Sequence, residues 1–162
     1  MSIDSTNAPA CRSRSLGEEI ASSTAHGVGL LASLVASPIL IAAAVRDRDT
    51  QTVVSVGVFA VTLVLLYLSS TLYHAFPVGR PKRVFEVLDN AAVFLLIAGT
   101  YTPLTLGLLR GAWGWTLFAT VWAMATTGVI LATVFNLRYR AASACLCLGM
   151  GWLFLIALRP VA

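Results

Sequence analysis

Long apolar runs separated by short polar connections dominate the sequence. Five runs without a charged residue follow one another, at 20–45, 50–79, 90–109, 111–137 and 141–158. A helix needs about 20 residues to cross a bilayer, and each run is long enough, the last only just. In lipid an open segment satisfies its backbone polar groups only as a helix. The pattern therefore predicts an all-α, polytopic membrane helix bundle with about five transmembrane helices, at about 20–45, 52–76, 84–102, 112–136 and 141–158.

The residues before the first run are polar and predict a different kind of segment. Residues 1–17 include several serines, an asparagine, a proline and two arginines, a composition typical of a disordered arm. Glu18 and Glu19 stand just before the first run, which starts too late for a signal peptide, so we expect its helix to be retained. The expected organisation is a disordered polar arm over 1–17 and one transmembrane domain over 18–162.

Composition supports lipid as the surrounding solvent. Charged residues make up 11% of the chain, against roughly 25% in a typical soluble domain, and the mean hydropathy is +0.85. Such a chain cannot cover itself with polar surface, so the lipid bilayer is its expected partner. The net charge of +4 comes from Lys and Arg placed between apolar runs, which favours a role in membrane orientation. No nucleic-acid partner is expected.

The connections between the runs carry unequal numbers of basic residues. One side of the membrane receives seven Lys and Arg side chains: Arg12, Arg14, Arg80, Lys82, Arg83, Arg138 and Arg140. The other side receives four: Arg46, Arg48, Arg110 and Arg159. Because basic residues concentrate in cytoplasmic connections, the pattern predicts a multi-pass protein of the cell membrane with a cytoplasmic N-terminus.

Three polar residues stand where lipid disfavours them. Ser70 and His74 are four residues apart near the end of the second run, and therefore on one helix face. If the third helix starts near Arg83, Asp89 lies about 9 Å into it, at a similar depth. A carboxylate inside a spanning helix costs on the order of 2.5–3.5 kcal/mol at mid-bilayer and is usually paired or functional. We therefore expect Ser70, His74 and Asp89 to line one pocket near the cytoplasmic face.

A purely structural interpretation of these residues stays open. His74 can bond a neighbour or reach the interface, and Asp89 can be an acidic residue at a helix start, which the macrodipole favours. His26 is either a fourth polar contributor or, in the interpretation we favour, an interfacial residue that caps the entry of the first helix. Glu86 is expected to be solvated.

Small residues and a proline predict how the helices pack. Gly99 and Gly128 are expected to let neighbouring helices approach closely. Thr102–Pro103 should kink or end the third helix, with Tyr101 in the interfacial belt.

Four motifs carry a resemblance to a known family. They are EEIASSTAHGVG at 18–29, SSTLYHAF at 69–76, EVLDNAAVFLLIAGTYTPLTL at 86–106 and LFLIALRP at 153–160. With these motifs the chain resembles the hemolysin III family, within the wider superfamily of seven-helix receptors and alkaline ceramidases that includes the adiponectin and progestin receptors. The resemblance covers nearly everything after residue 17.

The resemblance implies a seven-helix fold and zinc-dependent hydrolysis of a lipid amide from within the bilayer. In that superfamily a serine and a histidine end helix two and an aspartate begins helix three, and these match Ser70, His74 and Asp89. By resemblance His74 is a zinc ligand, Asp89 is a catalytic base or holds the attacking water, and Ser70 is catalytic as the residue that stabilises the oxyanion.

The chain also departs from the superfamily pattern. The other two zinc ligands of the superfamily, histidines four apart in an HxxxH motif on helix seven, have no counterpart in this sequence, and Asn90 stands where the bacterial family often has histidine. We expect a chain truncated after the fifth helix, whose incomplete site does not hold Zn²⁺ tightly and whose hydrolase activity is lost. The surfaces left by missing helices favour a homo-oligomer. The bacterial inner membrane is the expected location.

Two other classes of function stay open. A membrane-perturbing, cytolysin-like protein is suggested by the family name, although the residues contain no ring of like charges that would indicate a pore. A ligand-sensing membrane receptor is neither favoured nor excluded. The sequence therefore leaves undecided whether the chain is an enzyme, with a lipid as its expected substrate if it is.

Overall fold

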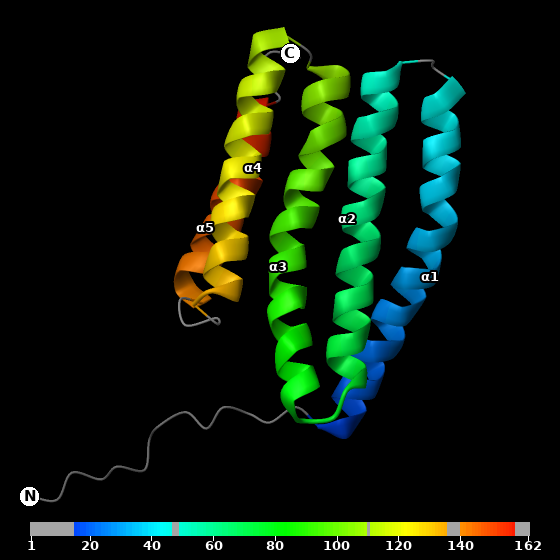
Figure 1. The fold of residues 1–162 in the computed structure, drawn as a ribbon, viewed down its shortest axis with the longest axis vertical. Coiled ribbons are helices and arrows are strands. Elements are labelled where there is room, and N and C mark those ends of the chain that lie inside the picture. Colours follow the sequence, from blue (N-terminus) through cyan, green and yellow to red (C-terminus); the bar gives the residue numbers. More distant parts are fainter. Residues whose placement is uncertain (1–14, 47–48, 110, 136–139, 158–162) are drawn as a thin grey trace, which may run out of the picture.

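Five α-helices joined by short connections make up the computed structural model, which describes residues 15–46, 49–109, 111–135 and 140–157. They are α1 (Leu16–Arg46), α2 (Thr50–Ala75), α3 (Arg80–Thr102), α4 (Gly111–Thr133) and α5 (Arg140–Ala157), with a π-helical segment η1 (Pro103–Leu108) that continues α3. Successive helices run antiparallel. Helices α1 to α4 stand side by side, and α5 packs beside α4 and α3 (Figure 1). No strand occurs in these ranges, which confirms the predicted all-α membrane bundle.

Within the described ranges, four helical segments have the length and apolar character needed to cross a bilayer. They are α1, α2, α3 together with η1, and α4, whereas the apolar part of α5, Ala141–Leu155, is shorter than these spans. Large apolar side chains face outward along the bundle, and on α1 Leu31, Val35 and Ile39 are each more than 60% exposed. Lipid is the solvent that covers such a surface. The chain is therefore a multi-pass membrane protein.

Helix α1 begins at Leu16, earlier than residue 20, where the apolar run starts. The Ser15 backbone N–H donates to Glu18 Oε2 at 2.8 Å, and the Glu18 N–H donates to Ser15 Oγ at 3.3 Å, which is a reciprocal capping box. This cap starts the helix at Leu16, so Glu18 and Glu19 lie in its first turn and not before it. The expected boundary between residues 17 and 18 thus falls inside a helix. Residues 1–14 of the predicted disordered arm lie outside the described residues.

The predicted break at Thr102–Pro103 takes the form of a change in helix type. Helix α3 ends at Thr102, and the chain continues through η1, where the Leu109 N–H donates to the Leu104 carbonyl oxygen at 2.9 Å. Proline has no N–H to donate, so the regular ladder is interrupted here. The side-chain hydroxyl of Thr105 donates to the Tyr101 carbonyl oxygen at 2.8 Å. The span therefore continues past the proline as a π-helical segment.

Two glycines allow the close helix contacts predicted for them. A Cβ placed on Gly99 would clash with the Thr62 side chain of α2, and a Cβ placed on Gly128 of α4 would clash with the Phe94 ring of α3. Small residues at such crossings let helix backbones approach in a membrane. The central helix α3 is thus packed closely on both sides.

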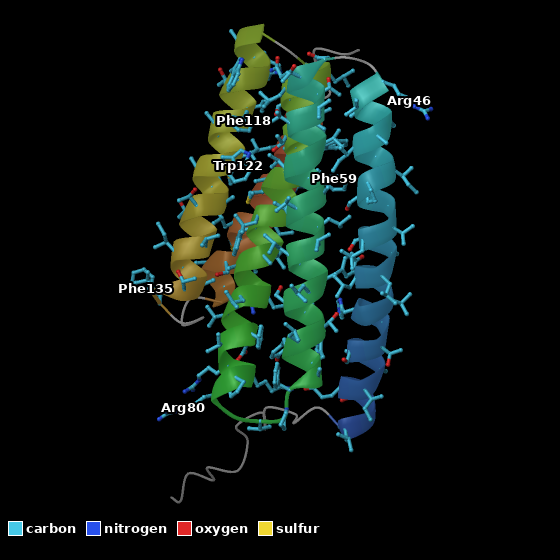
Figure 2. The ribbon with its side chains drawn as sticks, turned by 45° about the vertical axis from the view of Figure 1, so that its right-hand side comes forward. Arg46, Phe59, Arg80, Phe118, Trp122 and Phe135 are labelled. Atoms are coloured by element: carbon cyan, nitrogen blue, oxygen red, sulfur yellow. The ribbon has the colours of Figure 1, made fainter. Side chains whose placement is uncertain are left out.

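The core of the bundle lies between α3, α4 and α5. It is formed by buried side chains from all three helices: Phe94, Ala98, Tyr101, Val121, Ala125 and Met150. The Tyr101 hydroxyl donates to the Met150 carbonyl oxygen at 2.6 Å, so the prediction of an interfacial Tyr101 is wrong. Trp122 of α4 donates its Nε1–H to the Thr102 hydroxyl at 3.2 Å, on the side of α4 that packs against α3 (Figure 2). These two bonds tie both later helices to α3.

Candidate functional site

His74 lies near the end of α2 and is held by a carboxylate from another helix. Its Nδ1 is 2.9 Å from Glu19 Oε2, in the first turn of α1. The other oxygen of the same carboxylate, Oε1, is 3.1 Å from Lys82 Nζ, at the start of α3. The three side chains are largely buried, with 7 to 18% of their surfaces exposed. This Glu19–His74–Lys82 cluster therefore ties three helices together at one end of the bundle.

Lys82 has two further contacts that fix its position. Its Nζ donates to the Phe76 carbonyl oxygen at 3.3 Å, where α2 ends, and lies 5.1 Å from the centre of the Tyr73 ring. A cation at that distance from an aromatic face is attracted by it. Lys82 is thus a fixed member of the cluster. This role is additional to the contribution to membrane orientation that its sequence position indicates.

His26 belongs to the same region. It lies ten residues after the start of α1, and its ring stacks on His74 with centroids 5.5 Å apart and planes at 12°. Tyr67 is the next aromatic neighbour, with ring centroids 6.1 Å apart. The Nδ1 atom of His26 is buried, with no hydrogen-bond partner among the described residues. The interpretation of His26 as a cap at the entry of α1 is therefore wrong, and the alternative of a fourth polar contributor describes its place.

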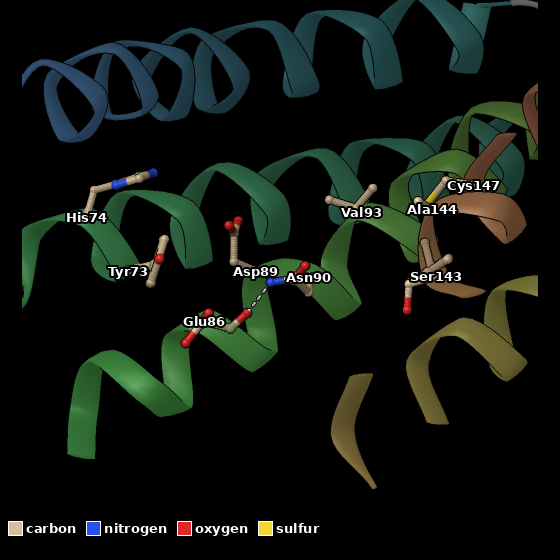
Figure 3. A pocket seen from close by; sticks show the side chains of 10 residues that line it. Tyr73, His74, Glu86, Asp89, Asn90, Val93, Ser143, Ala144 and Cys147 are labelled. Carbon is tan, nitrogen blue, oxygen red and sulfur yellow. Dashed lines mark hydrogen bonds between the residues drawn. The ribbon is translucent and has the colours of Figure 1, made fainter. Parts of the chain in front are cut away.

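A polar cavity of about 430 Å³ opens between α2, α3 and α5 (Figure 3). Asp89, Glu86 and Asn90 of α3 lie in its wall, and the Asn90 side chain donates to the Glu86 carbonyl oxygen at 2.7 Å. The remaining lining residues come from all three helices: Tyr73, His74, Val93, Phe94, Ser143, Ala144 and Cys147. In Figure 3 the Asp89 carboxylate points toward α2, while the His74 ring points toward α1. Glu86 is half-buried in this wall and does not stand in open solvent as predicted.

A second cavity, of about 480 Å³, lies on the other side of His74. It is formed by the start of α1, the end of α2 and the connection to α3, and its polar lining includes Glu19, Ser23, Thr24 and Lys82. His74 lines both cavities. His74 is therefore the residue common to the linings of the two cavities.

The three residues predicted to converge are only partly brought together. His74 and Asp89 line the same cavity, whereas Ser70 is buried one turn earlier in α2 and lines neither cavity. Glu19, which contacts His74, and Lys82, which contacts Glu19, were not among the predicted site residues. A usable signal was present, since both are charged residues at the same expected end of the bundle as His74.

The donor set does not fit a zinc site of the superfamily type. Within the described ranges, no three His, Cys, Asp or Glu side chains are grouped so that they could hold a metal ion. A closed zinc site takes four ligands, and a catalytic one takes three from the protein. His74 also has one ring nitrogen engaged by Glu19. Tight zinc binding by these residues alone is therefore not supported.

The fold and the site define a class, a polytopic helical membrane protein with a buried polar cluster at one end of its first three helices. The sequence profile of the family described as "Haemolysin-III related" matches residues 14–162. The chain belongs to this family, as its motifs predicted.

Two curated relatives extend the comparison. The chain is 42% identical to "Hemolysin-3 homolog" of Bacillus subtilis (strain 168) over 144 residues, which cover 89% of this chain and 68% of that protein. It is also 42% identical to "Hemolysin-3" of Bacillus cereus over 144 residues, or 89% of this chain and 66% of that protein. The chain thus spans about two thirds of the length of each relative. No solved structure matches it significantly.

Proposed function

We propose that the cavity between α2, α3 and α5 receives the polar group of a membrane lipid. The observation that carries this proposal is that His74 and Asp89, from two different helices, line one polar cavity in a bundle whose outer surface is apolar. Ionisable residues within membrane segments are rare and mark functional sites by default. A membrane lipid fits both features, because its polar group can enter the cavity while its apolar chains lie against the outer surface of the bundle.

The reaction proposed for the wider scaffold is hydrolysis of a lipid amide, as the family resemblance implies. Asp89 would accept a proton from water or hold it in place, His74 would serve as a ligand, and Ser70 would stabilise developing negative charge. The burial of Ser70 outside the cavity lining gives its role the least structural support. Because the described donors are too few for zinc, we propose that this chain alone neither retains Zn²⁺ nor hydrolyses the lipid.

Two measurements on the purified chain test these points. Metal analysis after incubation with zinc and dialysis should find far less than one ion per chain. A fluorescent N-acyl lipid in mixed micelles should bind to the wild type and not to Val93→Trp, because this side chain lines the cavity and a larger one would fill it. Val61→Trp, on an outward-facing position of α2, is the control and should bind normally. Stoichiometric zinc would refute the incomplete site, and unchanged binding by Val93→Trp would refute the lipid cavity.

A second candidate function is membrane lysis, for which the printed names of the two relatives are the support. It is separable from the polar site by measuring leakage of red cells exposed to wild type and to His74→Ala. Leakage that depends on the imidazole would connect lysis with the cavity. Leakage of equal extent in both proteins would make lysis a property of the apolar bundle.

We further propose that the N-terminus faces the cytoplasm and that the chain resides in a bacterial inner membrane. The support is the seven-to-four distribution of Lys and Arg between the two sides. The cluster around His74 would then lie near the cytoplasmic leaflet.

A further inference from the structure

The face of α3 that carries its first arginines is basic at the start and apolar in the following turns. Arg80, Arg83, Val84, Val87 and Leu88 line a cavity of about 390 Å³, and among the described residues no carboxylate is part of its lining. Their spacing of three and four residues places them on one face of the helix. Figure 2 shows Arg80 at the end of α3, extending outward from the bundle. This face therefore joins two fixed positive charges to an apolar strip.

The apolar strip leads into a groove between three helices. Leu88 also lines a second cavity, of about 300 Å³, whose walls are almost entirely apolar side chains of α2, α3 and α4. Leu68 of α2 and Leu95 of α3 belong to the same wall, and both Leu68 and Leu88 are at least 40% exposed. The groove is thus bordered by side chains exposed to the surrounding lipid, and Leu88 lines both the groove and the basic cavity.

The length of this path matches one leaflet of a bilayer. From Arg80 to Leu95 the helix advances 15 residues, or about 22 Å at 1.5 Å per residue. A single leaflet with its headgroups is about 20–22 Å deep, half of a bilayer of 40–45 Å. A phospholipid whose phosphate lies at the arginines would therefore have its acyl chains beside the groove.

The charge at the head of this path selects the kind of lipid. In the described part of the chain, a neighbouring cavity brings Arg80, Lys82 and Arg83 together with one carboxylate, that of Glu86. Lys82 is already bound to Glu19 and to the Phe76 carbonyl oxygen, so the two arginines are the side chains suited to an external anion. Guanidinium groups bind phosphate oxygens in a bidentate manner. A net negative headgroup fits this field, whereas the cationic part of a zwitterionic headgroup would be repelled.

We propose that this face of α3 is a binding site for an anionic phospholipid, with the phosphate at Arg80 and Arg83 and the acyl chains along Leu88 and the α2–α3–α4 groove. Asp89 and His74 of the polar cavity belong to neither of the two cavities that the arginines line, although Glu86 borders both regions. The proposal therefore does not depend on the function proposed for the polar cavity.

The test compares phosphatidylglycerol with phosphatidylcholine bound to the purified full chain in detergent micelles, measured by native mass spectrometry. Each basic side chain near an anionic surface contributes favourably to the binding free energy of an anionic lipid. Loss of two such side chains should therefore weaken binding on the order of 30-fold. Wild type should therefore prefer phosphatidylglycerol, and the double variant Arg80→Gln/Arg83→Gln should lose that preference. Arg46→Gln removes an exposed arginine at the opposite end of the bundle and should keep it. Equal binding of both lipids to wild type, or an unchanged preference in the double variant, would overturn the proposal.

A second variant tests the groove apart from the charge. Leu88→Trp enlarges the side chain that lines both cavities and leaves the arginines in place, so it should weaken binding of long-chain phosphatidylglycerol several-fold. Unchanged affinity would show that the headgroup alone is bound and would refute the groove. Helix content measured by circular dichroism in phosphatidylcholine micelles verifies folding. Should the double variant not fold, the single variants Arg80→Gln and Arg83→Gln, each expected to lose about 5-fold, decide the same question.

Discussion

At the scale of single residues, Glu19 is the side chain that determines how His74 is presented. An ionised carboxylate only accepts hydrogen bonds, and the contact of Glu19 with Lys82 favours its ionised form. Nδ1 of His74 must then be the donor in the 2.9 Å contact. Carboxylates commonly orient functional imidazoles in this manner. Glu19 is therefore a positioning residue for His74.

Replacing Glu19 by Gln should alter the state of His74. The variant keeps the shape of the side chain but loses the charge that holds Nδ1–H and Lys82, so we expect a loss of about 1–2 kcal/mol in the free energy of unfolding. The ¹⁵N signals of the His74 ring should report a mixture of tautomers where the wild type shows one. The chain has two histidines, so a His26→Gln sample assigns the signals.

The matched control for this experiment is Glu18→Gln. Glu18 is the exposed neighbour whose carboxylate accepts a bond from the Ser15 N–H, and glutamine serves equally well in a capping box. The control should leave both the stability and the His74 signals unchanged. Identical His74 signals in Glu19→Gln and wild type would show that the carboxylate does not set the tautomer.

At the scale of helices, the contact between α2 and α3 depends on Gly99. The Thr62 side chain occupies the space that a Cβ on Gly99 would take. Thr62 is buried, and its hydroxyl donates to the Phe59 carbonyl oxygen at 2.9 Å, which fixes its rotamer. A larger residue at position 99 therefore cannot be accommodated by a simple movement of Thr62.

Gly99→Ala should accordingly destabilise the bundle by about 1–3 kcal/mol, the range typical of overpacked interiors. The measurement is unfolding of the purified chain in mixed micelles, followed by circular dichroism. Gly57→Ala in α2 is the control, because nothing lies within 4 Å of an added Cβ there. That control should be neutral or stabilising by about 0.5–1 kcal/mol, since alanine favours helix over glycine. Equal effects of the two substitutions would contradict the close contact at Gly99.

The helices were predictable from the sequence to the extent that hydropathy specifies them. Apolar runs identified all five helices, but the start of α1 was set by the Ser15–Glu18 cap and the end of α3 by a π-helical continuation, neither of which hydropathy measures. Tyr101 was misplaced because aromatic residues suit both interfaces and cores. Its burial depends on a carbonyl partner in α5, 49 residues away.

The sequence identified site residues only where a single side chain is energetically unfavourable in lipid. His74 and Asp89 were noticed because lipid disfavours them, and they line one cavity. Glu19 was placed just before the first apolar run and given no site role, since its partner is 55 residues distant in the sequence and the pairing follows from the antiparallel arrangement of α1 and α2. The position of Ser70 outside the cavity could not be anticipated either, because a shared helix face does not specify which neighbour that face meets.

At the scale of the whole molecule, the two ends of the bundle differ in charge. The start of α1, the connection between α2 and α3, and the first turn of α3 with Arg80, Lys82 and Arg83 lie at one end, and Arg46 lies at the other (Figure 2). The positive-inside rule assigns the more basic end to the cytoplasm. Both the Glu19–His74–Lys82 cluster and the arginine face of α3 would then meet the cytoplasmic leaflet, where anionic lipids attract basic side chains.

Cysteine accessibility in intact cells provides the test of this orientation. A background in which Cys11, Cys145 and Cys147 are replaced by serine receives one new cysteine at a time, either Val78→Cys or Arg46→Cys. Both positions are exposed, one in the α2–α3 connection and the other at the end of α1. A membrane-impermeant maleimide should label Arg46→Cys in intact cells and Val78→Cys only after permeabilisation, because the basic end faces inward. The reverse order of labelling would place the polar cluster at the outer leaflet and would overturn the cytoplasmic assignment of the N-terminus.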